Sequence, residues 1–116
     1  MKLKEIQALL NARGLTGEEN PELEVQSACS SDMMSDVLAF PKEHMVLLTG
    51  LVNPQVMRTA DMLDIRMVVF VRGKTPAEEA LELARENGIS VLSTDHTLYN
   101  ASGILFTNGL NNRVKG

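Results

Sequence analysis

The sequence predicts an α/β domain: a small three-layer structure around a mostly parallel sheet built from consecutive βα units. Residues 65–71 form an almost unbroken apolar run rich in β-branched side chains, typical of a strand covered on both faces. An amphipathic helix pattern over 75–88 and a second apolar strand at 89–93 follow, and strand, helix and strand of these lengths form a right-handed βαβ unit. A similar unit at 45–63 shares the middle strand, so two crossovers adjoin.

The first 44 residues contribute a helix, an edge strand and a short second helix. Residues 2–12 place leucine and isoleucine on one face of an amphipathic helix. Polar and apolar residues alternate over 22–26, which predicts a half-exposed edge strand that continues through Ala28-Cys29. Ser30-Ser31-Asp32 then predicts the start of a helix that ends near Phe40-Pro41.

The later helices have recognisable ends. Asn53-Pro54 and Thr75-Pro76 each place a capping residue before proline, which favours the first helical position. Asn87-Gly88 ends the second of these helices. Thr97 caps a final helix that runs to about Phe106.

Composition limits the functional classes. A chain of 116 residues predicts one domain, 1–116, with a core of about 23–110. The net charge of −4 and 3% aromatic content argue against nucleic-acid binding, and no apolar run reaches the roughly 18 residues of a membrane span. A charged amino terminus without a signal-peptide pattern and a single cysteine indicate the cytoplasm.

Gly73-Lys74-Thr75 copies the tail of a phosphate-binding P-loop and lies between a strand and a helix. The full motif needs a glycine five residues before Gly73, and Val68 occupies that position inside the predicted strand. Pro76 also removes an amide from the first helical turn. The motif is therefore interpreted as a tight turn between strand and helix.

Cys29 and His96 leave an enzymatic alternative open, because a thiolate needs an imidazole nearby and each follows a predicted strand. Asp95 beside His96 is not a ready orienting partner, since adjacent side chains usually point apart. A small buried cysteine and a loop histidine explain the same residues. No spacing of histidine, cysteine or acids predicts a metal site, and no cofactor is expected.

Polar residues follow the carboxyl ends of all the predicted strands. In a parallel sheet these loops share one rim, and the free amides of helix N-termini attract anions there. Arg72 and Lys74 with small hydroxyl residues suit a phosphate or carboxylate. The predicted ligand-binding residues are Ser31, Asp32, Thr49, Gly50, Arg72, Gly73, Lys74, Thr94, Asp95 and His96.

The middle of the chain contains a run of linked motifs: Val68-Val69-Phe70-Val71-Arg72-Gly73, then Thr75-Pro76, then Asn87-Gly88-Ile89-Ser90-Val91-Leu92. With Asp32 to Ala39 and Met45 to Gly50 before them, these motifs resemble the DRTGG domain family. The resemblance covers roughly 23–110, and the chain is similar too to the amino-terminal domain of HPr kinase/phosphorylase, where such a strand, Arg-Gly turn and helix recur. After Thr49-Gly50, where a polar signature is expected, this sequence has Leu51-Val52-Asn53-Pro54.

The resemblance implies a regulatory or associating role. Such domains accompany phosphate acetyltransferases and sit between CBS modules in some inorganic pyrophosphatases. In the HPr kinase relative the kinase chemistry lies in a separate P-loop domain. A catalytic role is therefore not expected from the resemblance.

Three functional hypotheses remain. The first is a non-catalytic regulatory module, a cytoplasmic homodimer that senses a small phosphorylated metabolite or adenine nucleotide at the rim, binds a metabolic enzyme, or both. Met33-Met34 and the exposed side of helix 53–64, with Met57, are its candidate protein contacts. The second is a homo-oligomeric subunit that only mediates interactions, and the third is a small enzyme that uses Cys29 or His96.

Overall fold

A computed structural model describes residues 1–111 of the chain. Its sheet has five strands in the order β1-β5-β4-β3-β2. The strands are β1 (Arg13–Gly14), β2 (Ser27–Ser30), β3 (Met45–Thr49), β4 (Met67–Phe70) and β5 (Ser90–Ser93). The helices are α1 (Leu3–Leu10), α2 (Met34–Ala39), α3 (Gln55–Met62), α4 (Glu78–Glu86) and α5 (Leu98–Thr107).

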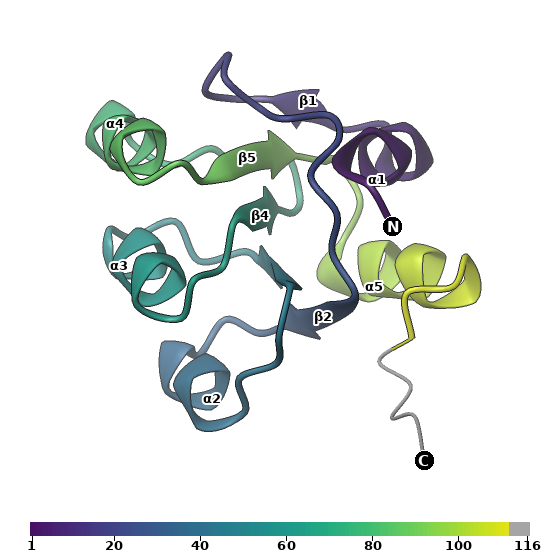
Figure 1. Ribbon diagram of the computed structural model, residues 1–116. Helices are drawn as coiled ribbons and strands as arrows, with labels where there is room; N and C mark the ends of the chain where they lie inside the picture. Colours follow the sequence, from purple (N-terminus) through teal and green to yellow (C-terminus); the bar gives the residue numbers. More distant parts are fainter. Residues whose placement is uncertain (112–116) are drawn as a thin grey trace.

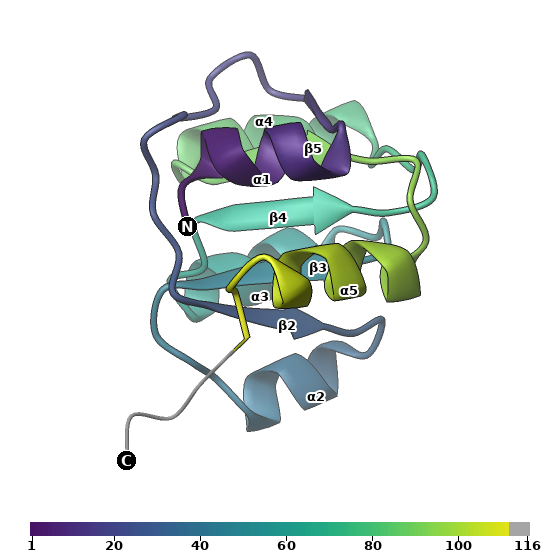
Figure 2. The same cartoon turned by 90° about the vertical axis from the view of Figure 1, so that its right-hand side faces the viewer.

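Strands β2 to β5 are parallel and follow one another in chain order, which confirms the predicted mostly parallel α/β fold. Crossovers of one hand therefore place α2, α3 and α4 on the same face of the sheet (Figure 1). Helices α1 and α5 cover the opposite face, side by side above the strands (Figure 2). The result is the three-layer arrangement expected from the sequence.

The sheet separates two apolar clusters. Alternate side chains of β3, β4 and β5 point to opposite faces, and every residue of these strands is buried. Val68, Phe70 and Val91 belong to the cluster beneath α2, α3 and α4. Val69 and Leu92 belong to the cluster beneath α1 and α5. The near-continuous apolar runs of the sequence thus correspond to strands covered on both sides.

The edge strands differ from the expectation. The alternating stretch 22–26 contains only an isolated bridge between Lys2 and Glu24, and the strand itself is β2, at the point where the prediction placed its continuation. Leu23 and Val25 alternate because they pack against the α1 cluster. On the other edge β1 pairs with β5 in the antiparallel direction, which the sequence analysis did not predict.

Helix starts were predicted unevenly. Thr97 Oγ1 accepts a hydrogen bond from the Asn100 amide at 3.1 Å, as expected of an N-cap. Asn53 Oδ1 accepts from the Gln55 amide at 3.0 Å, but α3 begins at Gln55 and Pro54, not Asn53, stands at its N-cap. The Thr75-Pro76 prediction was wrong, because α4 begins only at Glu78 and Ala77 stands at its N-cap. Pro76 is buried instead, so the loop continues extended into the core before the helix starts.

Within residues 1–111, no helix combines the length and apolar character that a membrane crossing requires.

Candidate functional site

The carboxyl ends of β2, β3, β4 and β5 lie along one edge of the sheet, on the right in Figure 2. Their parallel register brings this about: Ser30 pairs with Leu48, Thr49 with Phe70, and Phe70 with Ser93. Thr49 ends β3, and the loops that follow these strands carry the other nine predicted ligand-binding residues. We call this edge the rim.

The first contact across the rim joins the β2 and β3 loops. Asp32 Oδ1 accepts hydrogen bonds from the Gly50 amide at 2.7 Å and from Thr49 Oγ1 at 3.1 Å. Thr49 Oγ1 in turn accepts from the Leu51 amide at 3.1 Å. The Asp32 carboxylate therefore already accepts the hydrogen bond of the Gly50 amide, the donor after β3 that could attract an anion.

Arg72 extends this cluster from the β4 loop. It adopts a left-handed backbone conformation with φ 57°, and its amide donates to the His96 carbonyl at 2.8 Å. A Cβ atom added to Gly50 would lie 2.8 Å from Arg72 Nη2 and 3.5 Å from Asp32 Oδ1. The guanidinium thus lies over the Gly50 backbone, and a glycine there leaves room for it.

Gly73 joins the β4 loop to the β5 loop. Its φ of 67° favours glycine, and its amide donates to the Thr94 carbonyl at 2.8 Å. A Cβ atom on Gly73 would lie 3.0 Å from Asp95 Oδ1. Asp95 therefore faces the β4 loop, while the Lys74 side chain is exposed to solvent.

Thr94 and His96 face the α1 side instead. Thr94 is buried, and its Oγ1 donates to the Leu10 carbonyl at 2.7 Å while accepting from the His96 amide at 3.3 Å. His96 lines a hollow of about 330 Å³ with Asn11 and Asn100. Asp95 lines the same hollow, so the expectation that the Asp95 and His96 side chains point apart stays a prediction.

The rim thus contains one polar cluster and several residues outside it. Asp32, Thr49, Gly50 and Arg72 come together, with Gly73 and Asp95 beside them. Ser31 makes a local turn with the backbone of Met33, at 3.0 and 3.2 Å. Its role in the structure is therefore to shape the β2 loop.

An arginine beside a small polar cluster can hold a phosphate or carboxylate by charge-assisted hydrogen bonds. Because Asp32 occupies the Gly50 amide, an incoming anion would contact Arg72 or displace the Asp32 carboxylate. No group of three or more metal-ligating side chains occurs among residues 1–111.

Cys29 and His96 do not form a nucleophilic pair. They belong to β2 and to the loop after β5, which lie three strand spacings apart in the sheet, about 14 Å. Cys29 packs against the cluster under α2, α3 and α4, whereas His96 faces α1 and α5. Partial burial raises the pKa of the Cys29 thiol, and Asp36 adds to the rise while Lys42 opposes it.

The methionines are only partly available as protein contacts. Met57 has no exposed surface and Met34 is 4% exposed, so the expectation that Met57 forms an exposed contact was wrong. On an amphipathic helix the buried stripe includes Met57 together with Val56 and Ala60. Met33 is 60% exposed and Met62, on the same helix as Met57, is 72% exposed.

Asn11 and Asn100 lie beside His96 and were not among the predicted site residues. Asn11 ends α1 with φ 48°, a conformation that asparagine tolerates better than most residues. That preference was the available signal for a helix end at Asn11. Its proximity to the β5 loop depends on how α1 packs and could not be taken from local pattern.

No family model matches the chain, and no curated protein matches its sequence. Among solved structures it is similar to the CBS and DRTGG domains of the regulatory region of Clostridium perfringens pyrophosphatase, determined with the activator diadenosine tetraphosphate. The superposition has a TM-score of 0.73 at 21% sequence identity and covers 90% of this chain. It spans 45% of the pyrophosphatase chain. The chain therefore has a DRTGG-like α/β fold.

Proposed function

We propose that this chain is a non-catalytic regulatory module that binds a small phosphorylated metabolite, with adenine nucleotides as the first class to test. The proposed site is the Arg72 side of the rim, formed by Asp32, Thr49, Gly50 and Arg72. Lys74 and the Asp95-His96 loop would complete its margin. The observation that carries the proposal is the position of Arg72 Nη2 directly above Gly50.

Two features support an anion at this position. The Arg72 side chain is exposed, and its planar guanidinium suits a phosphate. The Asp32 carboxylate already accepts hydrogen bonds from Thr49 and Gly50, which indicates that these donors suit an oxyanion. A phosphate could replace that carboxylate, and Asp32 would then release the β2 loop.

The structural neighbour supports a regulatory role. Its structure contains a regulatory region with an activator nucleotide bound. By extension, we propose that this chain regulates a metabolic enzyme, acts in the cytoplasm as a homodimer, and shares the regulatory character of the HPr kinase amino-terminal domain. Each of these is a proposal for this chain.

The test is thermal unfolding in the presence of AMP, ADP, ATP, diadenosine tetraphosphate and acetyl phosphate, with inorganic phosphate as the reference anion. A ligand at a hundred times its dissociation constant adds about 2.7 kcal/mol to the free energy of unfolding. For a domain of this size the midpoint would rise by about 10 °C. No change with any compound would contradict the proposal.

Three variants locate the site. Arg72→Ala and Lys74→Ala should abolish or strongly reduce the midpoint rise. Gly50→Ala should reduce it without removing any charged group, because the new Cβ displaces the flexible end of Arg72. Arg58→Ala removes an exposed arginine on α3 and serves as the control, with the rise unchanged.

The enzymatic alternative has a separate test. Turnover of a phosphorylated or acyl substrate that disappears in Cys29→Ala or His96→Ala would support it. The raised pKa of Cys29 argues against an activated thiolate at neutral pH. If neither ligand binding nor turnover is found, the interaction-only subunit becomes the preferred function.

A further inference from the structure

Helix α5 exposes large aromatic side chains and carries no charge. Ala101 and Leu105 are buried against the sheet, and yet Tyr99 is 87% and Phe106 is 61% exposed. The helix contains no charged residue between Leu98 and Thr107. A surface helix normally presents charged and polar residues to solvent, whereas the outer face of α5 presents two aromatic rings beside the uncharged Asn100 and Thr107.

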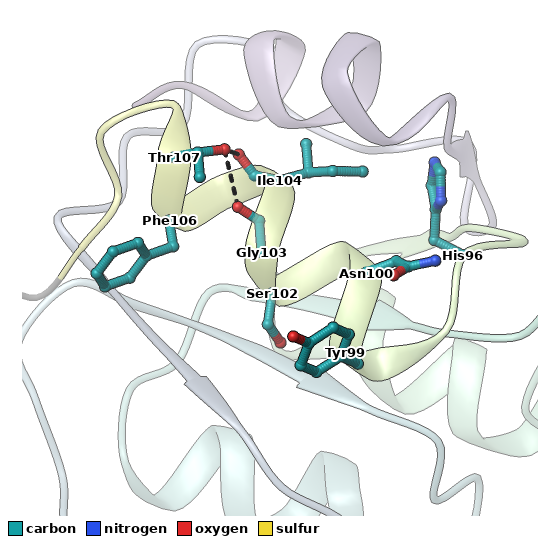
Figure 3. A pocket seen from close by; sticks show the side chains of 8 residues that line it. All are labelled: His96, Tyr99, Asn100, Ser102, Gly103, Ile104, Phe106 and Thr107. Carbon is teal, nitrogen blue, oxygen red and sulfur yellow. Dashed lines mark hydrogen bonds between the residues drawn. The ribbon is translucent and has the colours of Figure 1, made fainter.

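A hollow of about 610 Å³ lies on this outer face. Figure 3 shows Tyr99 and Phe106 projecting from α5 on either side of Ser102 and Gly103, away from α1. We call these four residues the α5 face. Its two aromatic side chains stand at the ends, and its two small residues lie in the middle.

Within residues 1–111, Gly103 has no close neighbour that requires a glycine, and its carbonyl accepts a hydrogen bond from the Thr107 hydroxyl at 2.9 Å. A Cβ atom at this position would meet nothing within 4 Å, and its φ is not in the left-handed region. Glycine inside a helix costs about 1 kcal/mol relative to alanine. Glycine also allows another backbone to approach closely, and that backbone can belong to a different molecule.

The order of residues on the α5 face is symmetric. Tyr99 and Phe106 are seven residues apart, which is about two helical turns, and they therefore lie on the same side of α5. Their midpoint falls between Ser102 and Gly103. A two-fold axis through that point would place Tyr99 of one copy opposite Phe106 of the other, twice, with small residues where the helices cross.

Charge also favours a second copy over a charged partner. The chain has 15 acidic and 11 basic residues, so two copies repel each other in general. The cost is smallest where both surfaces are uncharged, and residues 97–111 contain no Asp, Glu, Lys or Arg. An acidic or basic protein would find no complementary charge on α5.

We propose that the α5 face binds a second copy of this chain as an antiparallel, two-fold symmetric helix pair. Such an isologous contact uses one surface twice and closes at the dimer. The paired aromatic rings can adopt offset or edge-to-face contacts. This inference rests on the homodimer included in the proposed function and identifies its interacting surface, but it does not depend on the rim binding a metabolite.

The dimer is expected to be weak. Ten residues of helix span about 15 Å, and a contact of this length buries less than about 1,000 Å² unless neighbouring loops contribute. Molar mass should therefore be measured by sedimentation over a concentration series from about 1 to 500 µM. The weight-average mass should rise from the 12.7 kDa of one chain toward twice that value.

Phe106→Asp should hold the protein at the monomer mass, raising the dissociation constant at least tenfold, because it removes one ring of each aromatic pair and places a carboxylate against Tyr99 of the other copy. Phe40→Asp is the matched control: Phe40 is 67% exposed at the end of α2, and its replacement should leave the dimer unchanged. A wild-type monomer at 500 µM overturns the proposal. So does a Phe106→Asp protein that still dimerises, or loss of the dimer in both variants.

Disulfide trapping tests the antiparallel arrangement in a Cys29→Ala background. A mixture of Tyr99→Cys and Phe106→Cys proteins should form the 99–106 disulfide, because these positions face each other across the axis. Tyr99→Cys alone should not cross-link, since its two copies would lie about 10 Å apart along the helices, beyond disulfide reach. The reverse result would indicate a parallel pair and overturn the proposal.

Discussion

Helices α4 and α5 lie on opposite faces of the sheet, one directly before β5 and the other directly after it. They differ in the charge of their solvent-facing residues. Five of the nine residues of α4 are charged, whereas none of the ten residues of α5 is. Arg85 on α4 pairs with Glu78 at 2.9 Å, and its Nε donates to the Thr16 carbonyl at 2.9 Å. The outer face of α4 is therefore satisfied by water and its own ion pairs.

The difference shows that a buried apolar stripe on a helix does not imply a charged face on its solvent side. Both helices bury a stripe of alanine and leucine against the sheet. Only α4 has, opposite this stripe, the charged face that is typical of a solvent-exposed helix. The absence of such a face on α5 is the reason to look for a partner there.

The largest expected change in the free energy of unfolding comes from a comparison of the buried and exposed faces of α5. Leu105→Ala should lower the free energy of unfolding by about 3 kcal/mol, because Leu105 is 1% exposed and its removal leaves a cavity. Phe106→Ala, at the next residue, should change it by no more than about 0.5 kcal/mol in the monomer. Denaturant unfolding at low micromolar concentration measures both.

A large loss for Phe106→Ala in the monomer would mean that its ring packs within the chain. The α5 face would then be part of the core, and its comparison with α4 would fail. Repeating the measurement at high concentration adds the dimer, where Phe106→Ala should become more costly than at low concentration.

The second prediction concerns the loop that anchors α4. Glu19 accepts hydrogen bonds from the Thr16 amide at 2.9 Å, from the Thr16 hydroxyl, and from the Gly17 amide at 3.1 Å. Burial alone raises the pKa of Glu19, but the hydrogen bonds from Thr16 and from the Val91 amide outweigh it and hold the pKa below 4.5. Glu19→Gln should cost about 1 kcal/mol at pH 7, a modest value because Glu19 is partly exposed to solvent.

The pH dependence has a definite sign. Because the folded-state pKa of Glu19 is lowered, its contribution is fully present above pH 4.5 and is lost as the pH falls through the folded pKa. Unfolding midpoints of wild type and Glu19→Gln, measured from pH 7 to pH 2.5, should therefore converge at the acid end. A constant difference across this range would show that the carboxylate charge is not what anchors the loop.

Much of the fold could be predicted because its strands are covered on both sides. The apolar runs around Met45 and Met67 admit few other interpretations, and parallel order follows from the helix between each pair of strands. Strand β1 has only two residues, too few for any period to appear. Thr75 offered a good local cap, but burial of Pro76 outweighed it and moved the start of α4 to Glu78.

The location of the rim loops at one end of the strands could be predicted, but the contacts between their side chains could not. Parallel strands bring their carboxyl ends to one edge whatever the loops do. That Asp32 would bind the Gly50 amide, and that Arg72 would lie over Gly50, depends on loop conformations such as the positive φ of Arg72. The same limit applies to Thr94, whose hydroxyl donates to the Leu10 carbonyl at the end of α1, a contact that the sequence does not indicate.

The smallest expected change in the free energy of unfolding comes from replacing one glycine at each of the two helices by alanine. Gly103→Ala should stabilise the monomer by about 0.5 to 1 kcal/mol, since helix propensity improves and the new methyl group meets nothing within 4 Å. Gly88→Ala, just after α4, should destabilise because Gly88 has φ 68°. Chemical denaturation of both variants at low concentration measures the two signs.

The same Gly103→Ala protein should dimerise less well than wild type, because the added methyl group lies where the two α5 helices would cross. Opposite signs in unfolding and in self-association distinguish a glycine that serves a contact between copies from one that merely weakens a helix. If Gly103→Ala is more stable and dimerises as wild type does, the close approach at Gly103 is wrong, and any dimer must pair its α5 helices at a greater distance.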